Sequence, residues 1–196
     1  FPLMILAIDM GNTNIVLGGI DEKETYFIER VTTDQGRTDT EYAIHFKNIL
    51  EMHHIQLSDI EGSILSSVVP PLNTTILSAV EKAIGIRPLL VGSGMKTGMN
   101  ILMDNPKSVG SDMIVDVVAA IHEHPLPLVV IDMGTATTMS VLDQKGSFIG
   151  GVILPGLRTS LDALVSNAAQ LSQTSLTAPK KVIGKNTLDC MKGGMI

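Results

Sequence analysis

The sequence contains the same short pattern twice, and this repeat limits the possible fold more than any other feature. Asp9-Met10-Gly11 follows one apolar run, and Asp132-Met133-Gly134 follows another, 123 residues later. Each pattern leads into a β-branched segment and then a polar turn, which begins at Asp21 or Asp143, 12 or 11 residues after the aspartate. Because the spacing agrees to within one residue, we favour a duplication over a chance likeness of two hairpins.

Hydrophobic periodicity and turn residues predict an α/β chain in both halves. In the first half we expect strands at 3–9, 15–20, 25–31, 63–69 and 87–91, helices at about 38–54 and 72–84, and a glycine-rich loop at 92–109. A helix at 111–122 leads to the second half, with strands at 128–132, 137–142 and 147–154, a helix at about 157–171, a short strand or loop at 182–185 and a helix start at 187–191. The capping box of Thr38 and Glu41 and the stop at Gly85 support the first two helices. Two halves of this kind predict a duplicated α/β fold with a cleft between them.

Composition excludes several classes of function. The net charge is −6 and no Lys/Arg cluster occurs, so we expect no nucleic-acid or anionic-membrane partner. The apolar run near the first residue is too short for a signal peptide or a membrane span. Cys190 is the single cysteine, which rules out an intrachain disulfide and suits the cytoplasm. An anionic ligand would therefore have to be held by backbone amides or by a metal ion.

The turn Asp9 to Thr13 places a carboxylate where a strand ends, followed by glycine and small polar residues. Amide groups in such a turn can bind phosphate oxygens, and the carboxylate can hold Mg²⁺ beside them. An ordinary hairpin with an Asx-type turn remains the alternative. The second turn, Asp132 to Thr138, adds three threonine hydroxyls, although β propensity also explains threonines in a strand.

Two further stretches carry candidate chemistry. Gly110-Ser111-Asp112 opens a predicted helix, where Asp112 could be a cap or could act as a base toward a substrate hydroxyl. The stretch Gly150 to Gly156 permits either close backbone packing or the approach of a ligand. The sequence has neither a Gly-x-x-x-x-Gly-Lys-Ser/Thr loop nor a Gly-x-Gly-x-x-Gly turn after a strand.

Seven motifs together resemble those of one known family, the type III pantothenate kinases, in both order and spacing. The resemblance extends from about Met4 to the last residue. The motifs are Asp9-Met10-Gly11-Asn12-Thr13, Ser67-Val68-Val69-Pro70-Pro71, Asp104-Asn105-Pro106, Gly110-Ser111-Asp112, Asp132-Met133-Gly134-Thr135-Ala136-Thr137-Thr138, Gly150-Gly151-Val152-Ile153-Leu154-Pro155-Gly156 and Gly184-Lys185-Asn186-Thr187.

The resemblance implies a fold and an activity. The family belongs to the actin/sugar-kinase/heat-shock-ATPase superfamily, so we expect two actin-like (ribonuclease H-like) domains, each a mixed sheet with helices, with an ATP cleft between them. Their expected extents are 1–111 and 112–196, the second incomplete at its C-terminus. The implied enzyme is an ATP-dependent phosphotransferase that converts pantothenate to 4'-phosphopantothenate, the first step of coenzyme A biosynthesis. A cytoplasmic homodimer is expected.

The resemblance also assigns roles to individual positions. Asp112 would be the general base. Asp9 would lie near Mg²⁺, and Asp132 would hold a monovalent cation, K⁺ or NH₄⁺. ATP would be bound by Asp9, Met10, Gly11, Asn12, Thr13, Asn14, Ile15, Val16 and Thr135, and pantothenate by Met103, Gly110, Ser111, Asp112, Met113 and Thr187.

The sequence departs from the family pattern mainly in the expected acceptor pocket. Ser111-Asp112-Met113 stands where the family usually has Ala-Asp-Arg, and methionine cannot pair with the pantothenate carboxylate as arginine does. Met103 replaces an expected tyrosine, Ser140 a common aspartate, and Leu171-Ser172 a Leu-Pro pair. Two alternatives therefore stay open: a non-catalytic nucleotide-binding accessory or regulatory paralogue, and a superfamily kinase or phosphatase with another substrate.

Overall fold

The structure is a computed structural model, and it describes residues 3–92 and 95–195. The chain divides into two compact units, which we describe separately. The first comprises Phe1–Gly98 and Asn105–Asp116, and the second comprises Met99–Asp104 and Val117–Ile196. Residues 93 and 94 of the expected glycine-rich loop lie outside the described residues.

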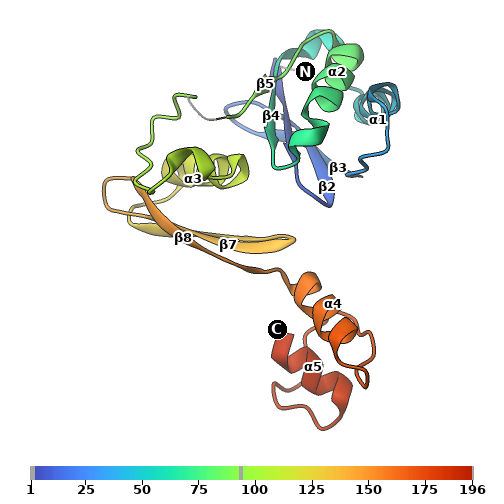
Figure 1. The fold of residues 1–196 in the computed structure, drawn as a ribbon. Helices are drawn as coiled ribbons and strands as arrows, with labels where there is room; N and C mark the ends of the chain where they lie inside the picture. The colour runs from blue at the N-terminus through green and yellow to red at the C-terminus, as the bar shows by residue number, and fades with distance from the viewer. Residues whose placement is uncertain (1–2, 93–94, 196) are drawn as a thin grey trace. The chain divides into compact units, whose positions relative to one another are not determined.

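A five-stranded mixed sheet forms the centre of the first unit, in the order β3-β2-β1-β4-β5. β1 (Met4–Met10), β2 (Asn14–Ile20) and β3 (Thr25–Thr32) are antiparallel neighbours. β4 (Ile60–Ser67) runs parallel to β1, and the short β5 (Leu89–Leu90) runs parallel to β4 (Figure 1). The parallel pair aligns the carboxyl ends of β1 and β4 at one edge of the sheet, where ligands bind in many α/β proteins.

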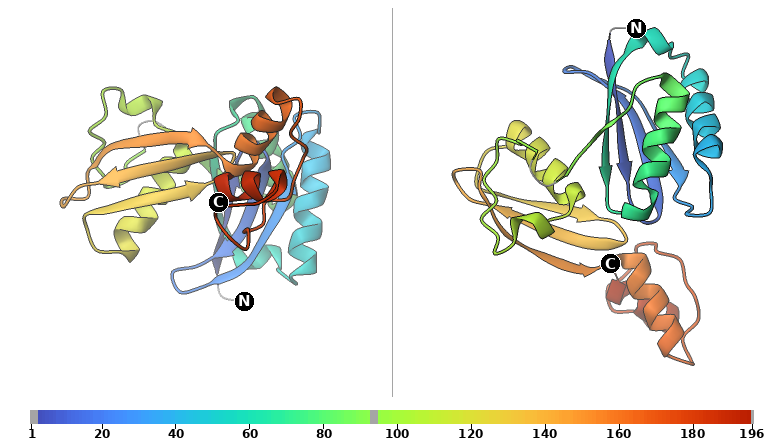
Figure 2. Two further views of the ribbon diagram at one scale, coloured as in Figure 1. Left: turned by 90° about the horizontal axis from the view of Figure 1, so that it is seen from below. Right: turned by 45° about the horizontal axis from the view of Figure 1, so that its top comes forward.

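Two helices, α1 (Asp39–Met52) and α2 (Asn73–Ile84), lie side by side against one face of this sheet (Figure 2). The predicted capping box at the start of α1 is confirmed, since Thr38 and Glu41 bond each other's backbone. Gly85 ends α2 in the left-handed conformation, at φ 75°, as the sequence indicated. Three 3-10 helices, at Leu57–Asp59, Pro70–Leu72 and Pro106–Ser108, complete the unit.

The core of the first unit lies between these helices and the sheet. Alternate residues of each strand point toward the helices, as the period of two in a strand requires. The absence of tryptophan makes this core largely aliphatic. Its most deeply buried members include Met4, Leu6, Ile8, Met10, Ile15, Leu17, Leu65, Tyr42, Phe46, Ile76, Ala79 and Val80.

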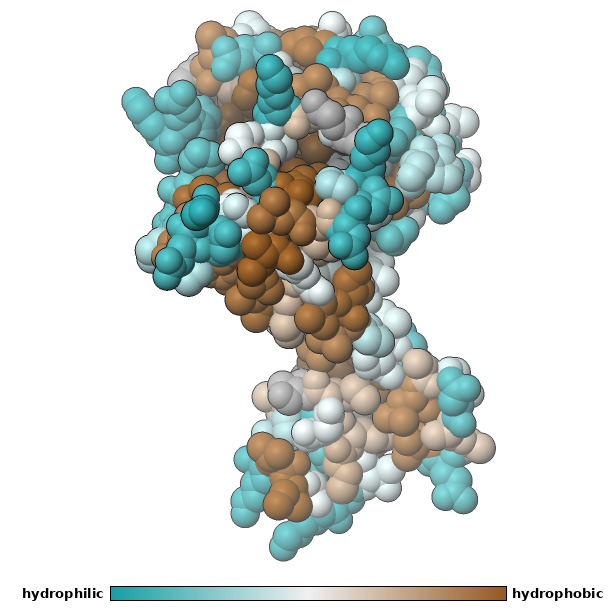
Figure 3. Space-filling model, turned by 60° about the vertical axis from the view of Figure 1, so that its left-hand side comes forward, coloured by the Kyte–Doolittle hydropathy of each residue, from teal (hydrophilic) through white to brown (hydrophobic). Residues whose placement is uncertain are grey.

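The second unit contains an antiparallel sheet of three strands, β6 (Leu128–Met133), β7 (Ala136–Leu142) and β8 (Phe148–Pro155), in that order. α3 (Ser111–Glu123) begins in the first unit and ends in the second. α4 (Leu157–Asn167) and α5 (Thr187–Met195) follow the sheet. Many apolar side chains of this sheet stay exposed, and Figure 3 shows apolar side chains gathered on the face that it views.

The polar turns of the two sheets are similar, because in each an aspartate accepts two amides from the residues that follow it, and this supports the duplication. Asp21 Oδ1 accepts hydrogen bonds from the amides of Lys23 and Glu24, and Asp143 Oδ1 accepts them from the amides of Lys145 and Ser147. Hydrogen bonds to the charged form lower the pKa of a carboxyl. The pKa of Asp21 is accordingly lowered, first by the Tyr26 hydroxyl and then by these amides, and that of Asp143 is lowered, first by the Ser147 amide.

Several predicted boundaries were wrong. The helix expected at 157–171 ends at Asn167, because Ala168 adopts an extended conformation, with φ −121° and ψ 97°, while its amide still donates to the Leu164 carbonyl. Residues 182–185, predicted as a short strand or a loop, form bends and coil, which agrees with the second alternative. The strand expected at 87–91 is only Leu89–Leu90, because the chain pairs with β4 over just two residues.

No helix in the described part of the chain is both long enough and apolar enough to cross a membrane.

Candidate functional site

The turn between β1 and β2 is closed by its own backbone. The amide of Gly11 donates to the Asn14 carbonyl oxygen at 2.9 Å. Thr33, just beyond β3, braces the turn from outside: its hydroxyl donates to the Gly11 carbonyl at 2.7 Å, and its amide donates to the Thr13 carbonyl at 3.0 Å. The hairpin itself uses the Gly11 amide, so a phosphate at this turn would have to meet other donors.

Exposure separates the predicted ATP-binding residues of this turn into two groups. Met10 and Ile15 are fully buried in the core, so only their backbone could meet a ligand. Asp9, Asn12 and Thr13 are exposed, while Asn14 and Val16 are half-buried. A ligand at this hairpin would thus meet a carboxylate and the polar atoms of Asn12 and Thr13 before anything apolar.

A chain of contacts joins Asp9 to the start of α3 within the first unit. Asp9 is the β-ladder partner of Ser66 on the parallel strand β4. The Ser66 hydroxyl donates to the Ser111 hydroxyl at 3.4 Å, and the Ser111 hydroxyl in turn donates to the Ser67 carbonyl at 2.7 Å. Asp112 is the next residue, so the structure places both predicted carboxylates at the carboxyl edge of the same sheet.

Asp112 lies in the first turn of α3, where a carboxylate is favoured by the helix dipole. Its Oδ1 atom accepts a hydrogen bond from the Met113 amide at 2.7 Å. A Cβ atom on Gly110 would meet this same oxygen, so glycine at that position leaves room for the carboxylate. Asp112 is the second residue of α3, and the Ile114 amide bonds the Gly110 carbonyl, so the interpretation of Asp112 as the N-cap was wrong.

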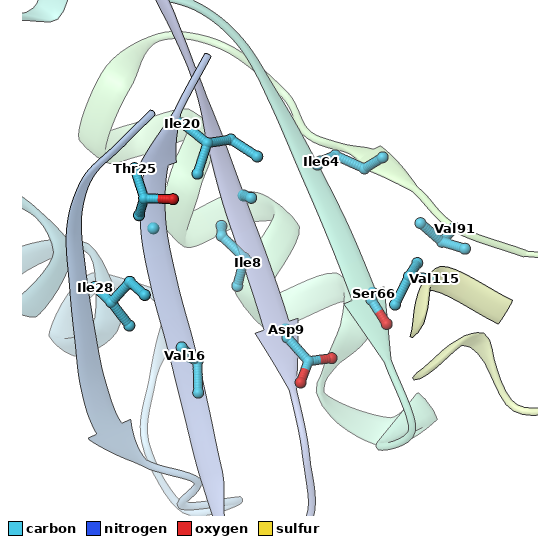
Figure 4. Close-up of a pocket in the computed structure, with 12 residues that line it drawn as sticks. Ile8, Asp9, Val16, Ile20, Thr25, Ile28, Ile64, Ser66, Val91 and Val115 are labelled. Atoms are coloured by element: carbon cyan, nitrogen blue, oxygen red, sulfur yellow. The ribbon is translucent and has the colours of Figure 1, made fainter. Parts of the chain in front are cut away.

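A pocket of about 310 Å³ lies in the first unit, with lining residues from β1, β2, β3, β4 and α3. Asp9 and Ser66 lie on adjacent strands of this surface, and Val115 of α3 lies near Ser66 (Figure 4). The remaining lining is mainly aliphatic, from residues such as Val16, Ile28 and Ile64. Phosphates need donors or cations, so this pocket alone cannot be a triphosphate site; it offers apolar surface beside Asp9.

The second predicted turn lies in the second unit. Asp132 is exposed near the end of β6 and is the ladder partner of Thr138 on β7. The Thr135 carbonyl accepts hydrogen bonds from the Gly156 amide at 2.9 Å and the Thr159 hydroxyl at 2.8 Å. A Cβ on Gly156 would stand 2.6 Å from that carbonyl oxygen, so close packing explains this glycine without a ligand.

The other two predicted pantothenate residues also belong to the second unit. Met103 is half-buried in the segment Met99–Asp104, and Thr187 is the exposed first residue of α5. The predicted site residues are therefore divided: the structure brings Asp9, Gly110, Ser111, Asp112 and Met113 together in the first unit, and Met103, Asp132, Thr135 and Thr187 belong to the second.

The residues of the first unit fit Mg²⁺ only as part of a nucleotide complex. Among the described residues, no group of three or more His, Cys, Asp or Glu side chains could hold a metal ion. Mg²⁺ in kinase sites commonly keeps several waters and takes one or two carboxylates plus substrate phosphates. The exposed carboxylate of Asp9, at the end of β1, suits that mode of binding.

Sequence reasoning did not assign a role to three residues that shape this site: Thr33, Ser66 and Ser67. Ser67 belongs to the motif Ser67-Val68-Val69-Pro70-Pro71, and that motif does not indicate its contact with α3. Thr33 lies 22 residues from Gly11, and Ser67 lies 44 residues from Ser111. Contacts over such separations follow from strand order, so no local sequence signal could have identified them.

Comparison with solved structures places this architecture among known folds. A protein from Campylobacter jejuni named for the Baf family of transcriptional activators matches with a TM-score of 0.50 at 18% identity, covering 96% of this chain and 72% of that one. The type II variant of the Aquifex aeolicus Ppx/GppA phosphatase gives 0.48 at 11% identity, covering 83% and 55%. The ethanolamine utilization protein EutJ from Carboxydothermus hydrogenoformans gives 0.47 at 13%, covering 88% and 59%. The chain thus spans little more than half the length of the last two, and likeness at such low identity concerns the fold alone.

A family model gives a more specific result. The fold is mixed α/β, and a model of the type III pantothenate kinases matches residues 5–196, which points to a kinase-type phosphotransferase. The chain belongs to the type III pantothenate kinase family.

Proposed function

We propose that this protein is a pantothenate kinase, which transfers the γ-phosphoryl group of ATP to the primary hydroxyl of pantothenate and forms 4'-phosphopantothenate and ADP. The observation that carries the proposal is the placement of Asp9 and Asp112 at one edge of the first sheet, joined through Ser66 and Ser111. The family match supports the same activity. This reaction is the first step of coenzyme A biosynthesis.

Phosphoryl transfer depends on positioning and charge neutralisation more than on covalent chemistry. The Asp9 to Val16 hairpin would hold the ATP phosphates, and Asp9 would hold Mg²⁺, which neutralises phosphate charge when bound. Asp112 would accept the proton of the pantothenate hydroxyl as its oxygen attacks the γ-phosphorus and ADP leaves. The bond that orients the Asp112 carboxylate and its position in the first turn of α3 support this role.

The remaining roles complete the proposal. Asp132 would hold K⁺ or NH₄⁺, and Thr135 would contact ATP. Met103, Gly110, Met113 and Thr187 would line the pantothenate site. These assignments need two actin-like domains with the nucleotide between them, and we propose that the enzyme works as a homodimer in the cytoplasm. The repeated Asp-Met-Gly hairpins and Asx turns support the two-domain arrangement.

Met113 favours a second candidate, a nucleotide-binding accessory or regulatory protein that does not phosphorylate pantothenate. The family usually has arginine at this position, and a methionine side chain cannot make the bidentate bond to a carboxylate that arginine makes. A superfamily kinase or phosphatase with a different substrate would explain the same departure.

A direct phosphorylation assay separates these candidates. The purified chain is incubated with γ-labelled ATP, Mg²⁺, K⁺ and pantothenate, and the labelled product is separated and identified. Label that appears in 4'-phosphopantothenate only when pantothenate is present supports the proposal. ATP binding without transfer supports the accessory protein, whereas transfer to another alcohol in a panel of acceptors supports the third possibility.

A further inference from the structure

We propose that Ser111 is a positioning residue, which fixes the first turn of α3, and with it Asp112, against the carboxyl end of β4. The Ser111 hydroxyl donates to the Ser67 carbonyl oxygen at 2.7 Å and accepts from the Ser67 amide at 3.0 Å. Ser111 is buried, with 9% of its surface exposed. One side chain therefore bonds both polar backbone groups of a single strand residue.

The strand pairing explains why Ser67 needs such a partner. The amide of Val91, just beyond β5, donates to Leu65 of β4 at 2.8 Å, so the backbone groups of residue 65 face that side. Two residues farther along a strand the backbone faces the same side again, so the groups of Ser67 point where a longer β5 would lie. The next residue faces the opposite side of β4, where the Val68 amide donates to the Met10 carbonyl of β1 at 3.0 Å. The Ser111 hydroxyl takes the place of the missing β5 peptide.

A hydroxyl suits this position because it combines one donor with acceptor lone pairs, as a peptide group does. The family usually has alanine at this position, so its members must satisfy these backbone groups in another way. In this chain an alanine side chain would leave both backbone groups of Ser67 without this partner in a half-buried place, which is unfavourable. A threonine keeps the hydroxyl. Ser111→Ala and Ser111→Thr both change the side-chain volume little, but only the threonine keeps a hydroxyl that can bond Ser67.

The contact acts on the proposed chemistry through the next residue. Asp112 follows Ser111 in the first helical turn, and its Oδ1 is held by the Met113 amide at 2.7 Å. With Ser111 bonded to Ser67, and the neighbouring Ser66 opposite Asp9, the two carboxylates keep a fixed separation. A displacement of about 1 Å in a reacting group can lower a rate by about a hundredfold.

This inference rests on the proposed function, and the experiment separates the two. The full chain is compared as wild type, Ser111→Ala, Ser111→Thr and Ser63→Ala in the pantothenate assay, with kcat and the KM for ATP measured. Ser63 is a matched control, because it is a buried serine of the same β4 strand whose hydroxyl donates to the Leu6 carbonyl at 2.9 Å, away from the site. Urea unfolding confirms that each variant is folded under the assay conditions.

The expected result is a fall in kcat of about tenfold for Ser111→Ala with little change in the KM for ATP. Ser111→Thr restores most of the rate, and Ser63→Ala keeps the wild-type kcat. Wild-type kcat in Ser111→Ala, or an equal loss in Ser63→Ala, overturns the positioning role.

Amide hydrogen exchange provides a readout that needs no kinase activity. Faster exchange at Met113 and Ile114 in Ser111→Ala, but not in Ser63→Ala, supports the fixed helix start even if wild type phosphorylates nothing and the proposed function fails. Unchanged exchange at these amides overturns the inference.

Discussion

The hydroxyl of Thr33 donates a hydrogen bond of 2.7 Å to the carbonyl oxygen of Gly11, across 22 residues of sequence. With the bond from the Thr33 amide to the Thr13 carbonyl, it holds the β1–β2 turn from the far side of β2. The Gly11 amide is meanwhile used inside the turn, by Asn14. The shape of the proposed phosphate-binding hairpin, Asp9 to Val16, thus depends on Thr33, which is not part of that hairpin.

Thr33→Val should loosen this hairpin while preserving the shape of the side chain. Loss of the hydroxyl removes one hydrogen bond to a backbone carbonyl, worth about 1 kcal/mol. We expect ATP binding to weaken by about fivefold, measured by isothermal titration calorimetry with Mg-ATP. Thr32→Val is the matched control, because the Thr32 side chain is exposed and its pairing with Asn14 belongs to the strand backbone, which the substitution keeps. Equal affinities in the two variants would contradict the bracing role.

Asp112→Asn should abolish most of the proposed kinase activity. An amide keeps the size of the side chain but cannot accept the substrate proton, so kcat should fall by about 10²-fold or more. The measurement is the rate of 4'-phosphopantothenate formation. Glu123→Gln, at the exposed other end of α3, changes charge equally and should leave the rate unaltered. Near-normal turnover of the Asp112 variant would remove it from the role of base.

His54→Gly should stabilise the first unit. His54 has a positive φ of 57°, and it closes α1 with two bonds, His54 amide to Glu51 carbonyl at 3.0 Å and Ile55 amide to Leu50 carbonyl at 2.9 Å. This is the position after a helix where glycine is preferred. Glycine removes the strain of the left-handed conformation, but it also has more freedom in the unfolded chain, which offsets part of the gain. The net effect should raise the free energy of unfolding by about 0.5–1 kcal/mol.

Urea unfolding measures this change, and His53→Gly is its control. His53 has a negative φ, stacks on Phe27 at 4.8 Å between ring centroids and contacts Glu29 at 2.9 Å. Its replacement should lower stability. A His54→Gly variant that is also less stable than wild type would show that the histidine side chain itself is needed there.

Ser78→Ala should reduce stability in a pH-dependent way, through Asp39. The Ser78 hydroxyl donates to Asp39 Oδ2 at 2.6 Å, and Lys82 lies 2.9 Å from the same oxygen. These contacts, the serine first, lower the pKa of Asp39 to about 2 from an ordinary value of 3.8. Folding therefore favours the ionised form, and the resulting stability is present above the unfolded pKa and is lost as the pH falls through about 2.

The urea midpoint of Ser78→Ala should lie below that of wild type at pH 7, and the difference should shrink between pH 4 and pH 2. The same substitution in an Asp39→Asn background should show no such pH dependence. A constant difference across the pH range would mean that the serine acts by packing rather than through the carboxylate.

Local chemistry made much of the fold predictable. The capping box at Thr38, the glycine stop at Gly85 and the polar turns at Asp21 and Asp143 each depend on residues within four positions of one another. Such contacts are already present in a short stretch of sequence. The helix end at Asn167 was missed because hydrophobic periodicity does not show that Ala168 turns to an extended conformation.

The sequence by itself determined the α/β class, the duplicated hairpins and the family, because these rest on spacing and on motifs that can be read along the chain. Only the tertiary structure decided how the first site is held. Thr33 reaches Gly11 because β3 lies beside β2, and Ser111 reaches Ser67 because β5 is too short to pair with the end of β4. Strand order and strand length set these contacts, and neither is encoded in the residues around Asp9 or Asp112.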